Sequence, residues 1–329
     1  MPYHHLTPSE RKVIDFMRVA NFSQARIAQA LGRSQSTISR ELRRNGDRDG
    51  YYNPHAANVV YWKRREQHYS RTKRGHKDLM DLVETKLHRK WSPEQIAGRL
   101  RYVEYPHDRA KWISHETIYQ HVWEDKAHGG TLYRTLRRGR KIYGKRGTGR
   151  HPNTFIKGCV SIEQRPAIVN QRTRVGDWEG DTFFGRLRNG CLATLVERST
   201  GFLAAALMPN ACASSLNLAV LESLRPVPKA LVHTLTVDNG KEFAGFKSLE
   251  TQLEMHVYFA HPYSAWERAI NENTNGLLRQ YFPKKTNLST ITQQQLQDAL
   301  QCLNDRPRKR LLYRTPRELL SLSILALDT

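Results

Sequence analysis

The second half of the chain changes from helical to strand periodicity at about residue 172, and this change limits the fold more narrowly than any other feature. Apolar runs at 178–187, 191–197 and 202–208 predict three strands, joined by tight turns into an antiparallel meander. After them come predicted helices at 213–224, 243–253 and 267–281 and predicted strands at 231–237 and 255–260. A meander followed by strands that alternate with helices predicts an α/β core of ribonuclease-H-like type, with a mixed five-stranded sheet.

Carboxylates from distant parts of the sequence fall where this fold can bring them together. Asp238 directly follows the fourth predicted strand, and Glu272 lies on the helix at 267–281. On the first strand Asp177, Glu179 and Asp181 alternate onto one face, so the strand pattern leaves the choice among them open. Carboxylate oxygens suit Mg²⁺, and two such ions can promote phosphoryl transfer on a DNA backbone. We therefore expect a site for two Mg²⁺ ions, in which Mn²⁺ can substitute.

Each of these carboxylates also has an ordinary structural interpretation. Asp238-Asn239-Gly240 is typical of a turn, and a glutamate on a helix is usually solvated. As a set they favour a metal site, with Asn239 and Glu242 as candidates to support its ligands. Arg279 lies on the same side of the predicted helix as Glu272 and is expected to contact a DNA phosphate.

Residues 8–46 predict three short helices with the spacing of a helix-turn-helix. Ser23 is the expected N-cap of the second helix, and Gly32 makes the turn before the third. The first helix is expected to present an apolar face of Val13, Ile14, Phe16 and Met17. The expected core consists of Ile27, Ala28, Leu31, Ile38 and Leu42. The residues expected to contact DNA are Ser34, Gln35, Ser36, Thr37, Arg40, Arg43 and Arg44.

A second unit of similar pattern follows. Ser92 is the expected N-cap and Pro93 the first residue of one helix, and Ser114 begins another that runs to residue 123. The expected core consists of Ile96, Leu100, Ile118 and Val122. The expected DNA contacts are His115, Thr117 and Gln120. A purely structural helical unit is the alternative, because aromatic residues dominate and the turn is long.

The formal net charge of +22, with a pI near 10.1, points to a polyanionic partner, which the helical units identify as double-stranded DNA. Residues 131–150 contain no acidic residue and should order on DNA phosphates, although a merely flexible linker is the alternative. Their expected DNA contacts are Arg137, Arg138, Arg140, Lys141, Lys145 and Arg146. The expected domains are a helix-turn-helix at 1–50, a basic linker at 51–78, a second helix-turn-helix-like unit at 79–130, a basic hinge at 131–170, the catalytic core at 171–290 and packed helices at 291–329.

The remaining features argue against membrane and secreted proteins. No apolar run approaches the roughly 20 residues that span a bilayer, and the N-terminal residues lack a signal-peptide pattern. The four cysteines are scattered without a CxxC pair, which disfavours structural zinc and disulfides. We expect a bacterial cytoplasmic protein that associates with the nucleoid.

Several longer motifs stand out along the chain. They are Ile27-Ala-Gln-Ala-Leu-Gly, Thr37-Ile-Ser-Arg-Glu-Leu-Arg-Arg-Asn45, Asp238-Asn-Gly-Lys-Glu-Phe-Ala244, His261-Pro-Tyr-Ser-Ala-Trp-Glu-Arg268, Asn271-Glu-Asn-Thr-Asn-Gly-Leu-Leu-Arg-Gln-Tyr-Phe-Pro-Lys284, Asn304-Asp-Arg-Pro-Arg-Lys309 and Thr315-Pro-Arg-Glu318. Together they resemble the IS-thirty family of bacterial insertion-sequence transposases. The chain departs from the family pattern at Ala269-Ile270 and Lys285, where small residues are usual.

This resemblance implies a DDE transposase in which Asp181, Asp238 and Glu272 are the catalytic residues and the metal ligands. It selects Asp181 because the first family aspartate falls in a motif like Trp178-Glu-Gly-Asp181. It also implies binding of terminal inverted repeats, 3′-end cleavage and strand transfer into target DNA by a dimer or larger assembly. The rival hypotheses are a DNA-binding regulator on an inactive transposase scaffold and a nuclease that cleaves without joining.

Overall fold

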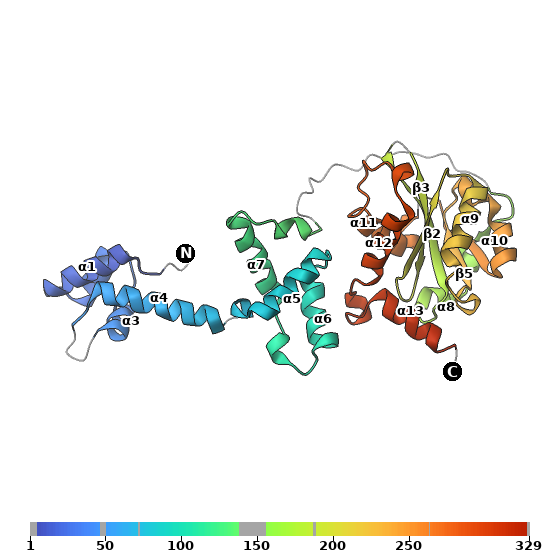
Figure 1. The fold of residues 1–329 in the computed structure, drawn as a ribbon. Helices are drawn as coiled ribbons and strands as arrows, with labels where there is room; N and C mark the ends of the chain where they lie inside the picture. Colours follow the sequence, from blue (N-terminus) through green and yellow to red (C-terminus); the bar gives the residue numbers. More distant parts are fainter. Residues whose placement is uncertain are drawn as a thin grey trace. The chain divides into compact units, whose positions relative to one another are not determined.

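The computed structural model describes residues 5–46, 51–71, 73–137, 156–186, 189–262 and 264–327 (Figure 1). The chain forms two compact units, Met1–Leu82 and Val83–Thr329. Within these described ranges, no helix is both long and apolar enough to cross a membrane.

The first unit contains the three predicted short helices, α1 (Pro8–Val19), α2 (Gln24–Ala30) and α3 (Gln35–Asn45). The hydroxyls of Ser23 and Ser34 accept hydrogen bonds from the first turns of α2 and α3, so both helices begin where a local N-cap satisfies free backbone amides. Ile14, Ile27 and Ile38 are fully buried at the centre of the unit. The predicted helix-turn-helix is confirmed.

A fourth helix, α4 (Pro54–Arg71), lies within the segment expected to be a basic linker. Ala57 of α4 and the preceding Tyr52 are buried in the same core as α1–α3. The Tyr52 hydroxyl donates to Glu41 at 2.9 Å, and Glu41 also pairs with the buried Arg11 at 2.8 Å. This polar cluster ties α1 and α3 to the chain that leads into α4.

The apolar face predicted for α1 is only partly correct. Ile14 is buried, but Val13 is 39% exposed and Phe16 is 73% exposed. The inward side of α1 instead carries Arg11 and Ile14, which are three residues apart and therefore share one face of the helix. Arg11 can be buried there because Glu41 neutralises it.

The second unit begins within α5 (Lys77–His88) and continues with α6 (Pro93–Arg99), a π-helical turn at Leu100–Glu104 and α7 (His115–Ala127). Ser92 caps α6 in a capping box with Gln95, and Ser114 caps α7. The four predicted core residues, Ile96, Leu100, Ile118 and Val122, are all 0% exposed.

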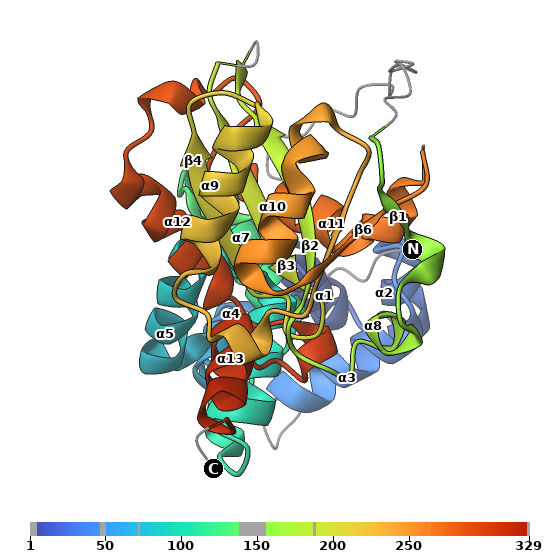
Figure 2. The ribbon, with the colours of Figure 1, turned by 90° about the vertical axis from the view of Figure 1, so that its right-hand side faces the viewer.

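A six-stranded sheet forms the centre of the second unit (Figures 1 and 2). Its strands are β1 (Val160–Ser161), β2 (Asp177–Phe184), β3 (Cys191–Glu197), β4 (Leu203–Met208), β5 (Thr234–Val237) and β6 (His256–Phe259), in the order β1-β6-β5-β2-β3-β4. Strands β2, β3 and β4 are antiparallel, whereas β5 runs parallel to β2 and β6. This is the predicted ribonuclease-H-like mixed sheet. It has a sixth strand because the two-residue β1 pairs in parallel with β6.

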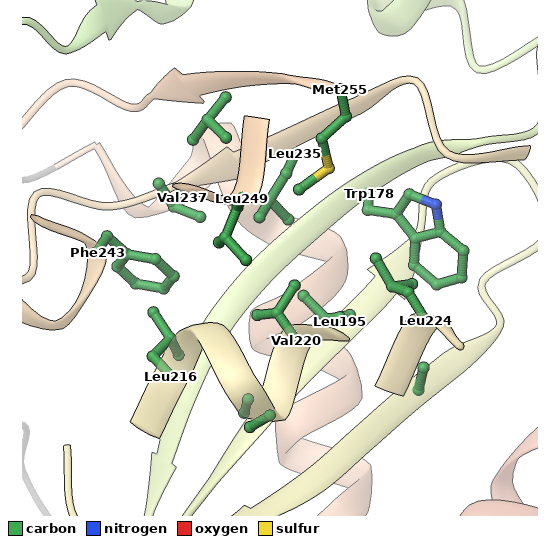
Figure 3. Close-up of a cluster of buried hydrophobic side chains, with 14 of the residues drawn as sticks. Trp178, Leu195, Leu216, Val220, Leu224, Leu235, Val237, Phe243, Leu249 and Met255 are labelled. Atoms are coloured by element: carbon green, nitrogen blue, oxygen red, sulfur yellow. The ribbon is translucent and has the colours of Figure 1, made fainter. Parts of the chain in front are cut away.

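Helices cover both faces of the sheet. The helices α9 (Ala213–Leu224) and α10 (Phe246–Leu253) pack on one face, where Trp178, Leu195 and Leu235 meet Val220 and Leu249 (Figure 3). The helices α11 (Ala269–Leu278) and α12 (Gln293–Asn304) pack on the other, and α13 (Pro316–Leu325) follows them. Side chains of successive strand residues point to opposite faces, so Trp178 faces α9 while its neighbours Asp177 and Glu179 face the side of α11.

Candidate active site

The register of β2 and β5 brings two of the predicted carboxylates together. Asp177 pairs with Thr234 and Glu179 with Thr236. Continuing this register by two residues sets Asp181 opposite Asp238, just beyond the last residue of β5. The two carboxylates therefore share one face and one end of neighbouring strands.

The guanidinium of Arg268 lies between these two carboxylates. Its Nη2 donates to Asp238 Oδ2 at 3.0 Å, and its Nη1 lies 3.5 Å from Asp181 Oδ1. Burial raises the pKa of Asp181, and the negative charge of Asp238 raises it further, whereas Arg268 opposes both effects. The carboxylates of Asp181 and Asp238 thus share the guanidinium of Arg268 at a partly buried site.

Hydrogen bonds orient both aspartates. The side-chain amide of Asn275 on α11 donates to Asp181 Oδ2 at 2.8 Å, and the Thr182 amide donates to Oδ1 at 3.0 Å. The Gly240 amide donates to Asp238 Oδ1 at 3.0 Å. These contacts hold the carboxylates in fixed orientations toward α11.

Glu272 is exposed in the first turn of α11. Its neighbour Asn271, which is 0% exposed, fixes this turn to the sheet. The Asn271 amide donates to Glu179 Oε2 at 3.0 Å, and its side chain donates to the Glu179 carbonyl at 2.8 Å. The third predicted carboxylate is therefore carried by a helix end that is anchored to β2, the strand of Asp181.

The other two acidic residues of β2 are occupied by protein partners. Asp177 is 1% exposed, pairs with Arg174 at 2.7 Å and accepts from Thr234 Oγ1 at 2.8 Å. Glu179 is 0% exposed and forms a close ion pair with the buried Arg198. Of the three carboxylates on this face, Asp181 is the one directed at Asp238.

The donor set fits a divalent cation. The carboxylate oxygens of Asp181 and Asp238 both contact the positively charged guanidinium of Arg268. The same oxygens are suitable ligands for a divalent cation. In the part of the chain that the structure describes, however, no three acidic, histidine or cysteine side chains are close enough to hold a metal as they stand. Among the described residues, Glu272 therefore does not complete a three-ligand cluster with this pair.

Two further predicted residues support the turn after β5. The Asn239 side chain donates to the Ala260 carbonyl at 2.7 Å and so links the ends of β5 and β6. Glu242 lies half-buried in the short 3₁₀ helix Lys241–Gly245.

The residues predicted to bind DNA lie mainly at exposed positions. On α3 the side chains of Ser34, Gln35, Ser36, Arg40, Arg43 and Arg44 are exposed and Thr37 is half-buried. On α7 His115 and Gln120 are exposed, and Thr117 is half-buried against the Ser114 cap. Arg137 is exposed, whereas Arg138, Arg140, Lys141, Lys145 and Arg146 lie outside the described residues.

Arg279 was expected to contact a DNA phosphate, and in the structure its guanidinium contacts protein groups. Its guanidinium stacks 3.6 Å from the centre of the Phe183 ring, and its Nη2 donates to the Phe184 carbonyl at 2.8 Å. Burial lowers its pKa. In this conformation Arg279 holds α11 against the end of β2.

Arg268, Asn271 and Asn275 contribute to the site although no role was predicted for them from the sequence. All three lie in motifs that carry the family resemblance, and Asn271 and Asn275 are one helical turn apart around Glu272. The four-residue spacing of Asn271 and Asn275 places both on one helix face and could have indicated two polar contacts there. The partner of each residue depends on the packing of α11 on β2.

This chain is similar to known proteins both in its N-terminal helices and over nearly its full length. Residues 2–45 match a family model described as a helix-turn-helix domain. The chain is 40% identical over 318 residues to the transposase for insertion sequence element IS4351 of Bacteroides fragilis, covering 95% of this chain and 94% of that protein. It is 37% identical to the transposase InsI for insertion sequence element IS30A of Escherichia coli K12, covering 98% of this chain and 85% of that protein.

Among solved structures, the catalytic core domain of BIV integrase matches with 21% identity and a TM-score of 0.38, covering 46% of this chain and 97% of that chain. The HTLV-2 integrase catalytic core domain in complex with magnesium matches with 17% identity and a TM-score of 0.36, covering 44% of this chain and 95% of that chain.

Proposed function

The chain belongs to the IS30 family of bacterial insertion-sequence transposases, and from this premise we propose that it binds the terminal inverted repeats of its element and catalyses Mg²⁺-dependent 3′-end cleavage and strand transfer. Asp181, Asp238 and Glu272 are the proposed ligands of two Mg²⁺ ions, which Mn²⁺ can replace. The observation that carries this proposal is the register that sets Asp181 opposite Asp238 around a shared positive charge. An enzyme with this substrate would work in the bacterial cytoplasm, at the nucleoid.

The protein's own residues contribute mainly by positioning. When bound, the metal ions supply activation of the attacking oxygen and neutralisation of charge on the leaving oxygen. Asn275 and the Thr182 amide orient Asp181, and the Gly240 amide orients Asp238. Asn271 fixes the helix turn that carries Glu272. Because little covalent chemistry falls to the protein in phosphoryl transfer, such fixed orientations are its main contribution.

Recognition of the element ends is assigned to the N-terminal unit. In a helix-turn-helix the second helix of the motif, here α3, enters the major groove. Exposed hydroxyl, amide and guanidinium groups on α3 are suited to base edges and phosphates. Two ends must be handled together, so we propose that the active form on DNA is a dimer or a larger assembly.

The test is a cleavage assay on a duplex that carries the terminal repeats of the element encoding this chain. With Mg²⁺ or Mn²⁺ we expect a nick that exposes a 3′ hydroxyl at the element end and, with target DNA added, joined products on a denaturing gel. With EDTA both products should disappear while DNA binding remains. Binding without any metal-dependent cleavage would instead support the regulator, and cleavage without joining would support the nuclease.

Substitution of the exposed arginines of α3 tests the DNA-binding assignment separately. Arg40→Gln with Arg43→Gln should weaken duplex binding and reduce the slope of log affinity against log salt by about 0.9 for each lost phosphate contact. The matched control is Lys12→Gln, which removes one charge from an exposed position on α1. Fluorescence anisotropy at several salt concentrations measures the slope, and an equal effect per charge at Lys12 would contradict a specific role for α3.

A further inference from the structure

The segment that follows α12 carries three arginines at alternate positions, Arg306, Arg308 and Arg310. The proposed cleavage and joining chemistry does not use this segment. The guanidinium groups contact uncharged partners: Arg306 donates to Gln280 Oε1 at 2.7 Å and to the Tyr281 hydroxyl at 3.1 Å. Arg308 donates to the Leu303 carbonyl at 3.2 Å, and Arg310 to the Ser199 carbonyl at 2.7 Å.

These three positive charges lack a directly paired carboxylate in the described part of the chain, although Glu197 and Glu179 act on Arg310 from farther away. Among the described residues, no carboxylate forms an ion pair with any of the three arginines, and Asp305 is paired with Arg317 instead. Burial, together with the charges of Arg306 and Arg310, lowers the pKa of Arg308 to about 10. Arg306 is buried and Arg308 is half-buried, and like charges that lie close together partly away from water are costly unless an anion joins them.

A hollow of about 330 Å³ opens beside this segment. Arg308 and Arg310 line one part of it, and Asn273 and Thr274 of α11 line another. Arg137, which was predicted to bind DNA, also lines the hollow. We call this feature the arginine hollow. Because α11 also carries Glu272, the hollow adjoins the helix that contributes the third proposed metal ligand.

We propose that the arginine hollow binds a phosphate of the DNA backbone and thereby positions the strand beside the carboxylates; this inference rests on the proposed function. Guanidinium groups bind phosphate oxygens through paired, charge-assisted hydrogen bonds, which suits arginines that have no ion-paired carboxylate; the neighbouring Lys309 of the hollow is instead paired with Glu94. The exposed Asn273 side chain adds a neutral hydrogen-bonding group to the lining of the hollow. A phosphodiester supplies the missing negative charge.

The test compares Arg310→Gln with Arg317→Gln in the full chain. Both remove one positive charge from an exposed arginine near the C-terminus, but Arg317 pairs with Asp305 and does not line the arginine hollow. The probe is a fluorescein-labelled 30-base-pair duplex of arbitrary sequence, without divalent ions. Arg310→Gln should weaken binding about threefold to tenfold near 0.1 M salt and reduce the salt slope by about one. Arg317→Gln should leave the slope unchanged.

Thermal melting separates a binding role from a structural one. Because Arg310 lies among like charges, its loss should not lower the melting temperature below that of Arg317→Gln. A clear drop in melting temperature, equal slopes for the two variants, or no change of slope in Arg310→Gln would each overturn the proposal. A further melting experiment adds 10 mM inorganic phosphate at constant ionic strength. If phosphate raised the melting temperature of the parent chain alone, and Arg310→Gln did not change the salt slope of duplex binding, the hollow would bind a free anion rather than DNA, and the proposal would be overturned.

This outcome is independent of the carboxylate site, because binding is measured without metal. A failure of metal-dependent cleavage in the parent chain would overturn the proposed function and leave the duplex measurement unaffected. Unchanged duplex binding in Arg310→Gln, with normal cleavage by the parent chain, would overturn only the inference about the arginine hollow.

Discussion

Asp238→Asn should reduce end cleavage and strand transfer at least about a thousandfold, because several kcal/mol of charge stabilisation at the reacting phosphate is lost. The substitution keeps the shape of the side chain and its ability to accept from the Gly240 amide. It removes the negative charge that faces Asp181 across Arg268. Cleavage and joining should both fail, since one carboxylate site serves both phosphoryl transfers.

The measurement is single-turnover cleavage of end-containing duplex with Mg²⁺, alongside duplex affinity without metal. Asp181→Asn and Glu272→Gln should have effects of similar size, with affinity nearly unchanged in all three variants. Asp298→Asn is the matched control, because Asp298 is an exposed aspartate on α12 that accepts a hydrogen bond from the neighbouring Gln294. Near-normal strand transfer by Asp238→Asn or Glu272→Gln would show that the metal ligands are misassigned.

Glu179→Ala should destabilise the second unit by about 3–5 kcal/mol, because it leaves the buried Arg198 without its carboxylate partner. The substitution also removes the oxygen that accepts from the Asn271 amide at the start of α11. For a unit of this size the loss corresponds to a fall in melting temperature on the order of 10 °C. Differential scanning fluorimetry of the full chain measures it as a shift in the transition of the second unit.

Glu272→Gln provides the matched stability control for Glu179→Ala. Glu272 is exposed, so its loss of charge should change the melting temperature little, whereas cleavage is expected to fall as in Asp238→Asn. The pair therefore separates a glutamate that holds the fold from a glutamate that acts on DNA. If Glu179→Ala kept the parental melting temperature but lost metal-dependent cleavage, Glu179 rather than Asp181 would be the carboxylate of the first strand.

Much of the local structure could be predicted because it depends on neighbouring residues. The serine N-caps at Ser23, Ser92 and Ser114 satisfy backbone amides within one turn, so they mark helix starts without tertiary information. The strand that was expected to begin at residue 231 begins at Thr234, because Lys229–Leu231 forms a 3₁₀ turn. Element boundaries shifted in this way, and the helix α4 and the strand β1 were not predicted.

Exposure of apolar residues in α1 was harder to predict. Periodicity identifies an apolar stripe but not how wide a stripe the neighbouring helices cover. Arg11 took an inward position because Glu41, thirty residues away, was available to neutralise it, and Phe16 remained outside.

By itself, the sequence determined the helix-turn-helix, the mixed sheet and the family, because caps, periodicities and motifs are properties of short segments. The strand pattern left the choice among the three carboxylates of β2 open and the family resemblance selected Asp181; only the tertiary structure revealed what faces each of them, since all three share one strand face. Asp177 meets Arg174, Glu179 meets Arg198, and Asp181 meets Arg268 and Asp238. The partners of Asp181 follow from the parallel register of β2 with β5 and from the anchoring of α11, which are long-range pairings that no local pattern specifies.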